Sequence, residues 1–196
     1  MTQSEIRSVC VFCGASLGNN PAFRAAAEQL GTLLAQNGVT VVFGGGKAGL
    51  MGTVADSALA AGGKVIGVIP DYLVEREHGH RGVTRLDIVD SMHSRKRRMF
   101  DLADGFVSLP GGVGTLEETF EVITWKQLEM HTKPIAVIDV AGYWQPLDRL
   151  ISATVEHGFA APPTRDLYTL VATPEEALDA LRADAETGPP ADSARL

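Results

Sequence analysis

The sequence Leu109-Pro110-Gly111-Gly112-Val113-Gly114-Thr115 lies between a short apolar run, residues 105–108, and a helical pattern that begins at Val113. Three glycines within four residues allow the backbone to curl, so that consecutive N–H groups can point inward. Thr115 adds a hydroxyl group in the first helical turn, where the helix dipole is positive. The stretch therefore predicts a phosphate-binding turn between a strand and a helix.

Apolar, β-branched runs alternate with helical patterns on both sides of this turn. The predicted strands are residues 8–12, 40–43, 64–69, 85–89, 105–108, 134–138 and 168–171. The predicted helices are residues 21–37, 49–61, 91–103, 113–130, 144–157 and 174–183. Several strands are continuous apolar runs, which is typical of a parallel sheet covered on both faces. This alternation predicts an α/β fold, a single Rossmann-like domain with a doubly wound, mainly parallel sheet and helices on both faces.

The expected domain covers residues 1–184. Residues 185–196 contain two prolines and no apolar period, so we expect a disordered tail. The chain has 196 residues, of which 45% are hydrophobic and 21% charged, as in ordinary globular proteins. Its net charge of −7 argues against nucleic acid as a partner. The sequence contains neither a secretory signal pattern nor an apolar run of roughly 20 residues, so we expect a cytoplasmic protein without a membrane partner.

Cys10 and Cys13 form a C-x-x-C pair, which is typical of some redox and zinc sites. A redox pair normally begins a helix, but this pair falls within and just after a predicted strand. A zinc site needs further ligands, and His78 and His80 are candidates by residue type alone. We therefore expect buried thiols in the core and no bound metal.

A second glycine turn follows the second predicted strand. Gly44, Gly46 and Gly49 satisfy G-x-G-x-x-G before a helix, and Asp71 lies about 20 residues further on, as in dinucleotide-binding proteins. The motif normally follows the first strand, and here it follows the second. Two interpretations remain open: a tight turn between closely packed elements, or a backbone that approaches a ligand. The second would allow an NAD-dependent oxidoreductase.

Four consecutive cations, Arg95 to Arg98, lie in the predicted helix 91–103. Apolar residues at helical spacing define its buried stripe: Met92, Met99 and Ala103. Lys96 falls within this stripe and Arg95 flanks it, so both are expected to face the protein body. Cations in that position need an anionic partner, such as a ligand phosphate or a carboxylate of the site.

Glu118 lies three residues after Thr115, one turn into the helix that begins at the glycine turn. A carboxylate does not help to bind phosphate, so it points to a sugar or a reacting carbon beside the phosphate. The alternative is a favourable acidic residue in the first turn of a helix. The same helix carries Val122 and Trp125 beside Glu118, away from its sheet-facing side. Either more chain or a second subunit must cover them, and we expect a homodimer.

The segment Ser91-Met92-His93-Ser94-Arg95-Lys96, followed by Pro110-Gly111-Gly112-Val113-Gly114-Thr115-Leu116-Glu117-Glu118, resembles the LOG ("Lonely Guy") family. Val122-Ile123-Thr124-Trp125 is also similar to that family, and the resemblance extends over residues 9–181. These proteins are cytokinin riboside 5′-monophosphate phosphoribohydrolases, often labelled lysine decarboxylases. The family cleaves the N-glycosidic bond of N6-substituted AMP into free base and ribose 5-phosphate. The resemblance implies this activity, possible action on AMP itself, no cofactor and a dimer.

The resemblance also implies which residues form the site. Arg95 and Glu118 are the implied catalytic pair. The implied substrate contacts are Glu77, Lys96, Gly112, Val113, Gly114, Thr115, Leu116, Glu117 and Thr124, with Gly45, Gly46 and Ser16 lining the same pocket. Ser16 belongs to Gly14-Ala15-Ser16, where many members have Gly-Ser-Ser. Ala15 therefore lacks the hydroxyl that those members carry at this position.

Three alternatives compete with the hydrolase. A lysine decarboxylase would need pyridoxal phosphate and a Schiff-base lysine, for which Lys47 and Lys96 are the candidates. An NAD-dependent oxidoreductase leaves the turn at 111–115 without a role. A non-catalytic nucleotide sensor or carrier has no need of the Arg95 and Glu118 pair. A nucleoside monophosphate is the expected substrate.

Overall fold

The computed structural model describes residues 5–76 and 78–187. Within them, seven strands form one sheet in which every neighbouring pair is parallel. The strand order is β4-β3-β2-β1-β5-β6-β7. The strands are β1 (Ser8–Phe12), β2 (Thr40–Phe43), β3 (Val65–Pro70), β4 (Arg85–Val89), β5 (Gly105–Ser108), β6 (Ile135–Ile138) and β7 (Thr169–Val171). The predicted strands and the parallel sheet are confirmed.

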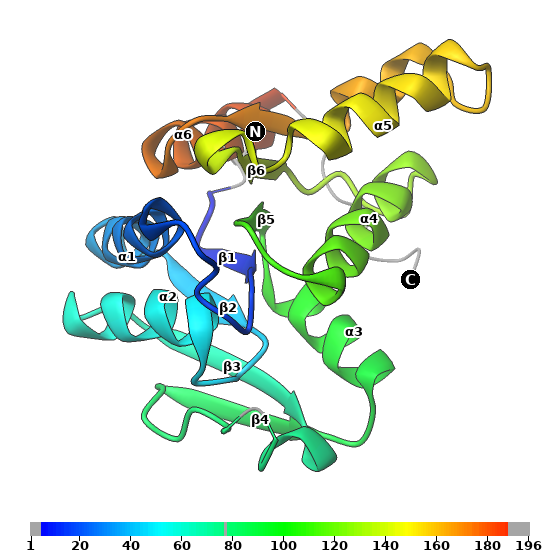
Figure 1. Ribbon diagram of the computed structural model, residues 1–196. Helices are drawn as coiled ribbons and strands as arrows, with labels where there is room; N and C mark the ends of the chain where they lie inside the picture. Colours follow the sequence, from blue (N-terminus) through cyan, green and yellow to red (C-terminus); the bar gives the residue numbers. More distant parts are fainter. Residues whose placement is uncertain (1–4, 77, 188–196) are drawn as a thin grey trace.

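Helices cover both faces of the sheet (Figure 1). On one face lie α1 (Pro21–Gln36), α2 (Gly49–Ala60) and α6 (Pro174–Thr187). On the other lie α3 (Met92–Leu102), α4 (Val113–Gln127) and α5 (Gln145–Glu156). Three short 3-10 helices complete the described elements: η1 (Asp71–Leu73), η2 (Val140–Gly142) and η3 (Pro162–Asp166). The single, doubly wound Rossmann-like domain is therefore confirmed.

The strand order places a topological switch point between β1 and β5. The chain builds β1 to β4 outward in one direction and then returns to add β5 to β7 on the other side of β1. Phe12 at the end of β1 pairs in register with Ser108 at the end of β5, so the two strands finish at the same edge. In open parallel sheets, ligands bind outside the carboxyl ends of the strands at such a point.

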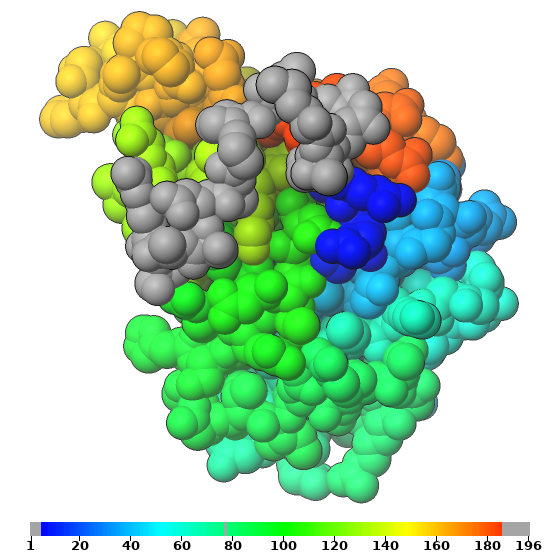
Figure 2. Space-filling view, turned by 180° about the vertical axis from the view of Figure 1, so that it is seen from behind, coloured from blue at the N-terminus to red at the C-terminus, as the bar shows by residue number. Residues whose placement is uncertain are grey.

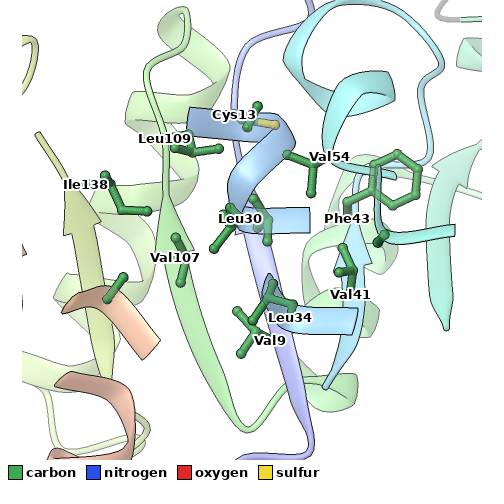
Figure 3. Close-up of a cluster of buried hydrophobic side chains, with 14 of the residues drawn as sticks. Val9, Cys13, Leu30, Leu34, Val41, Phe43, Val54, Val107, Leu109 and Ile138 are labelled. Carbon is green, nitrogen blue, oxygen red and sulfur yellow. The ribbon is translucent and has the colours of Figure 1, made fainter. Parts of the chain in front are cut away.

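Two apolar clusters pack on opposite faces of the sheet. One joins α1, α2 and α6 to the sheet, and Figure 3 shows Leu30 and Leu34 of α1 against Val9 and Val107 of the strands. The other joins α3, α4 and α5 and contains Phe106, Met99 and Trp144. Leu30, Leu34 and Phe106 are completely inaccessible to solvent. The continuous apolar strands are thus explained by burial on both faces.

Cys10 on β1 and Cys13, the residue just after β1, belong to the clusters on opposite faces of the sheet. Both are buried and free of disulfides, and burial raises the pKa of each thiol well above its ordinary value. His80, named above as a possible ligand by type, instead bonds through Nε2 to Asp56 at 2.8 Å. The prediction of buried core thiols is confirmed.

The C-terminal helix is longer than expected, and α5 stands out from the rest of the molecule. α6 continues to Thr187, so it enters the range that was expected to form a tail, and residues 188–196 lie outside the described part. α5 and the turn that follows it project from the body (Figure 2), and Phe159 in this turn is 87% exposed. None of the described helices is long and apolar enough to span a membrane.

Candidate active site

The turn between β5 and α4 is tight on one side and open on the other. A Cβ at Gly111 would lie 2.1 Å from Thr115 Oγ1 and 2.8 Å from the Gly14 nitrogen, so no larger residue fits there. A Cβ at Gly112 or Gly114 would meet no atom within 4 Å. Gly112 is the N-cap of α4 and supplies no capping side chain. The backbone can therefore approach a ligand closely on the open side, at the positive end of the helix.

A pocket of about 310 Å³ adjoins this turn. Residues 14–18 after β1 form one wall, Gly111 and Gly112 form another, and Phe23 and Tyr143 close it. Ser16, a predicted pocket residue, lies in this wall. The pocket lies at the carboxyl ends of β1 and β5, which is the switch point of the sheet.

The second glycine turn, residues 44–49 between β2 and α2, packs closely against neighbouring parts of the chain. The N–H groups of Leu50 and Met51, at the start of α2, both donate to the Gly14 carbonyl, at 2.9 and 3.3 Å. A Cβ at Gly49 would lie 2.3 Å from the Ala15 carbonyl carbon. These amides are therefore used to fix the loop after β1. The dinucleotide interpretation loses support, because it needs the N-terminus of α2 to receive a pyrophosphate.

Gly44 has its own partner, Arg95 of α3. The Arg95 side chain is buried, and its Nη2 atom donates to the Gly44 carbonyl at 2.8 Å. A Cβ at Gly44 would lie only 2.0 Å from the same nitrogen. The absence of a side chain at Gly44 therefore allows the guanidinium to reach the carboxyl edge of the sheet.

Lys96 lies nearer the surface than Arg95, which reverses the predicted order of depth. The stripe argument placed Lys96 inside and Arg95 at its flank, but Arg95 is 5% exposed as a residue and the Lys96 side chain 15%. Lys96 Nζ bonds to Glu117 at 2.6 Å and to Glu121 at 2.8 Å. Partial burial acts to lower its pKa, but the two hydrogen bonds outweigh burial, and the pKa is raised.

Glu118 is half-buried on α4 and lines a small space together with Phe12 of β1 and Phe106 of β5. Its negative charge contributes to the raised pKa values of both Cys10 and Cys13, whereas Arg95 acts on Cys10 in the opposite direction. Both charges must therefore lie near the same part of β1. The space between Glu118 and the α3 side chains is about 10 Å³, which is room for about one water molecule. That space is too small to admit a nucleotide.

Some of the other predicted site residues lie at the start of α4, and others lie elsewhere in the molecule. Val113, Gly114, Thr115 and Leu116 form the first turn of α4, and Glu117 is paired with Lys96. Gly45 and Gly46 are buried in the turn after β2. Thr124 is exposed, and nine residues at 1.5 Å per residue place it about 14 Å along α4 from Thr115. Glu77 lies outside the described residues.

The residue that the sequence prediction missed is Tyr143, whose hydroxyl donates to the Gly111 carbonyl. The sequence feature that could have identified Tyr143 is its position shortly after β6, at the sheet edge where the glycine turns also lie. A second correction concerns α4: Val122 is buried and Trp125 packs edge-on against Phe100 of α3, with ring centroids 5.1 Å apart. More of the same chain covers these residues, so they are no evidence for a second subunit.

Comparison with known families gives consistent matches. The family model described as "Possible lysine decarboxylase" matches residues 51–181. The chain is 44% identical to the probable cytokinin riboside 5′-monophosphate phosphoribohydrolase LOGL2 of Oryza sativa subsp. japonica, over 92% of this chain and 74% of that protein. It is 42% identical to the cytokinin riboside 5′-monophosphate phosphoribohydrolase of Rhodococcoides fascians, over 90% and 89% of the two chains.

Solved structures with low sequence identity share the fold. The molybdenum cofactor carrier protein of Chlamydomonas reinhardtii superposes with a TM-score of 0.68 at 18% identity, covering 92% of this chain and 98% of that one. The molybdenum cofactor binding protein of Rippkaea orientalis gives 0.70 at 18% identity, with the same coverage. At this identity the likeness concerns architecture alone.

Proposed function

Since the chain belongs to the family of cytokinin riboside 5′-monophosphate phosphoribohydrolases, we propose that it hydrolyses the N-glycosidic bond of N6-substituted AMP to free base and ribose 5-phosphate. The observation that carries the proposal is the construction of the start of α4. One helix presents an open glycine turn at its positive end and a carboxylate one turn later. A phosphate anchor and a group for a reacting sugar are thereby held on one rigid element.

The first turn of α4 binds the 5′-phosphate through the backbone of Gly112 to Thr115. Glu118 lies three positions after Thr115, a rise of about 4.5 Å along the helix axis. The anchored nucleotide thus holds its ribose beside the carboxylate. Glycosidic cleavage passes through an oxocarbenium-like state. Glu118 either stabilises this state electrostatically or acts as the base that activates the attacking water.

Arg95 and Lys96 complete the site from α3. The buried guanidinium of Arg95 orients the phosphate or the departing base, since its charge lies near the same strand ends as that of Glu118. The Lys96 ammonium has three N–H donors, and the carboxylates of Glu117 and Glu121 take two of them. Through these bonds Lys96 also ties α3 to the first turns of α4 and maintains the width of the site.

The competing activities fit the side chains less well. A Schiff base requires a neutral amine, but hydrogen bonds to two carboxylates raise the pKa of Lys96 and keep it protonated. Lys47, the other candidate, is exposed in the turn after β2. A nucleotide sensor would use the phosphate turn without need of Glu118, so turnover separates it from the hydrolase.

A homodimer remains part of the proposal. Val113 of α4 and Leu128, which caps its end, are 81% and 63% exposed, and helical spacing places both on the same side as Thr124. Thr124 of the same chain lies too far along the helix to reach the site. A second copy that covered this side of the helix would bring Thr124 of the partner subunit toward the site. A cytoplasmic location stays a prediction.

The first test is product analysis with purified protein and N6-isopentenyl-AMP. We expect free base and ribose 5-phosphate in equal amounts, measured together by mass spectrometry, with one oxygen from labelled water in the sugar phosphate. AMP in a parallel reaction shows whether the N6 group is required. Binding of the nucleotide without release of base would support the sensor alternative and refute the hydrolase.

A further inference from the structure

Tyr143 contacts the phosphate turn from the segment that follows β6. It follows β6 and η2, and its hydroxyl donates to the carbonyl of Gly111. Gly111 precedes Gly112, the N-cap of α4, so the hydrogen bond ends on the peptide unit that opens the turn. Tyr143 is half-buried and forms part of the wall of the 310 Å³ pocket.

The direction of this hydrogen bond fixes the direction of an amide. The Gly111–Gly112 peptide bond is trans, and in a trans peptide the C=O and the following N–H point in opposite directions. When Tyr143 holds the Gly111 oxygen on its own side, the Gly112 N–H points away from the tyrosine. Glycine permits both orientations of such a peptide. The flipped orientation would turn a carbonyl oxygen toward a bound phosphate and repel it.

The rest of the structure holds the Tyr143 ring in place. Its ring makes edge contacts with Phe23 on one side, at 5.8 Å between centroids, and with Trp144 on the other, at 5.3 Å. Asp139 accepts a hydrogen bond from the Trp144 N–H at 2.7 Å, which anchors the chain just after the tyrosine.

The backbone before Tyr143 is unusual. Ala141 and Gly142 have φ values of 53° and 77°, two successive left-handed residues of which the first is not glycine. A left-handed alanine carries a conformational cost that the surrounding contacts must offset, and such residues concentrate at functional sites.

We propose that Tyr143 is a positioning residue that locks the Gly111–Gly112 peptide in the orientation that accepts the 5′-phosphate of the substrate. The inference rests on the proposed function for the identity of the substrate, but it concerns phosphate binding alone. Tyr143 touches the turn and acts through it, without contacting the reacting bond. Loss of its hydroxyl should therefore weaken phosphate binding and leave the chemical step intact.

The test compares Tyr143→Phe with wild-type protein. We expect KM for the nucleoside monophosphate and the dissociation constant of ribose 5-phosphate to rise about tenfold, the scale of one hydrogen bond, with kcat within about twofold. Ribose 5-phosphate binding is measured by calorimetry and needs no turnover. Tyr168→Phe is the matched control, because the Tyr168 hydroxyl donates to Asp148 at 2.7 Å, on α5. The control should leave both constants unchanged.

The outcomes separate the two proposals. Wild-type protein that binds ribose 5-phosphate but releases no base would refute the hydrolase and leave the role of Tyr143 testable by binding. Unchanged ribose 5-phosphate binding in Tyr143→Phe would refute the positioning role alone. Equal weakening in Tyr143→Phe and Tyr168→Phe would also refute it, because a general loss of packing would then explain both.

Discussion

Replacement of Glu118 by Gln is expected to lower kcat for base release about 10³-fold, a loss typical of removing a group that stabilises charge or transfers a proton in the transition state. The substitution keeps the shape of the side chain and removes its negative charge. The cationic state at C1′ would then lose the carboxylate that faces it. KM should change little, because the phosphate turn that anchors the substrate is untouched.

The control for this variant is a glutamate that lies in the first turn of another helix. Glu175 occupies the first turn of α6, where it accepts a hydrogen bond from Gln29 at 2.7 Å. If Glu118 serves only the helix dipole, Glu118→Gln and Glu175→Gln should have similar small effects on thermal unfolding and none on kcat. Near-wild-type turnover by a folded Glu118→Gln protein would remove Glu118 from the mechanism.

Gly44→Ala is expected to lower kcat/KM about 10²-fold, as a misplaced positioning group can. Gly44 lacks the positive φ that would exclude alanine, so the backbone tolerates the change. The added Cβ would lie 2.0 Å from Arg95 Nη2, and the guanidinium is the flexible partner that must move. The variant should therefore fold normally and displace the cation. Steady-state kinetics and thermal unfolding measure the two effects separately.

A double-mutant cycle shows whether Gly44 acts through Arg95. Arg95→Ala alone should lower activity strongly. In that background, Gly44→Ala should add less than about a threefold loss, because no guanidinium remains to displace. Additive losses from the two substitutions would mean that Gly44 serves the substrate directly, in agreement with a backbone that approaches a ligand.

Periodicity was sufficient to predict the sheet. Strands buried on both faces are continuous apolar runs, and caps and glycines mark the helix ends, so most boundaries agreed within one or two residues. Two helix ends differ by more: α4 ends at Gln127, three residues before the predicted end, and α6 continues to Thr187, four residues beyond it. After α4, Glu129 adopts a φ of 57°. Glutamate rarely adopts a positive φ, so the residue types there do not predict that the helix ends at this point.

The site was predicted where a motif is local and missed where it depends on tertiary contact. The glycine turn and Glu118 share one helix, so their spacing in sequence fixes their spacing in space. The relative depth of Arg95 and Lys96 depended instead on Gly44 of another element, which leaves room for a guanidinium. Tyr143 meets Gly111 across 32 residues of sequence. Side-chain periodicity within one element cannot predict contacts between residues that are distant in sequence.

The role of the turn as a 5′-phosphate anchor is tested most directly by comparing kcat/KM for N6-isopentenyl-AMP with that for the nucleoside without its phosphate. If Gly112 to Thr115 hold the phosphate and thereby place C1′ beside Glu118, the nucleoside should react at least about 10³-fold more slowly, because the binding energy of the phosphate positions the reacting bond. Equal kcat/KM values for the two substrates would contradict the account.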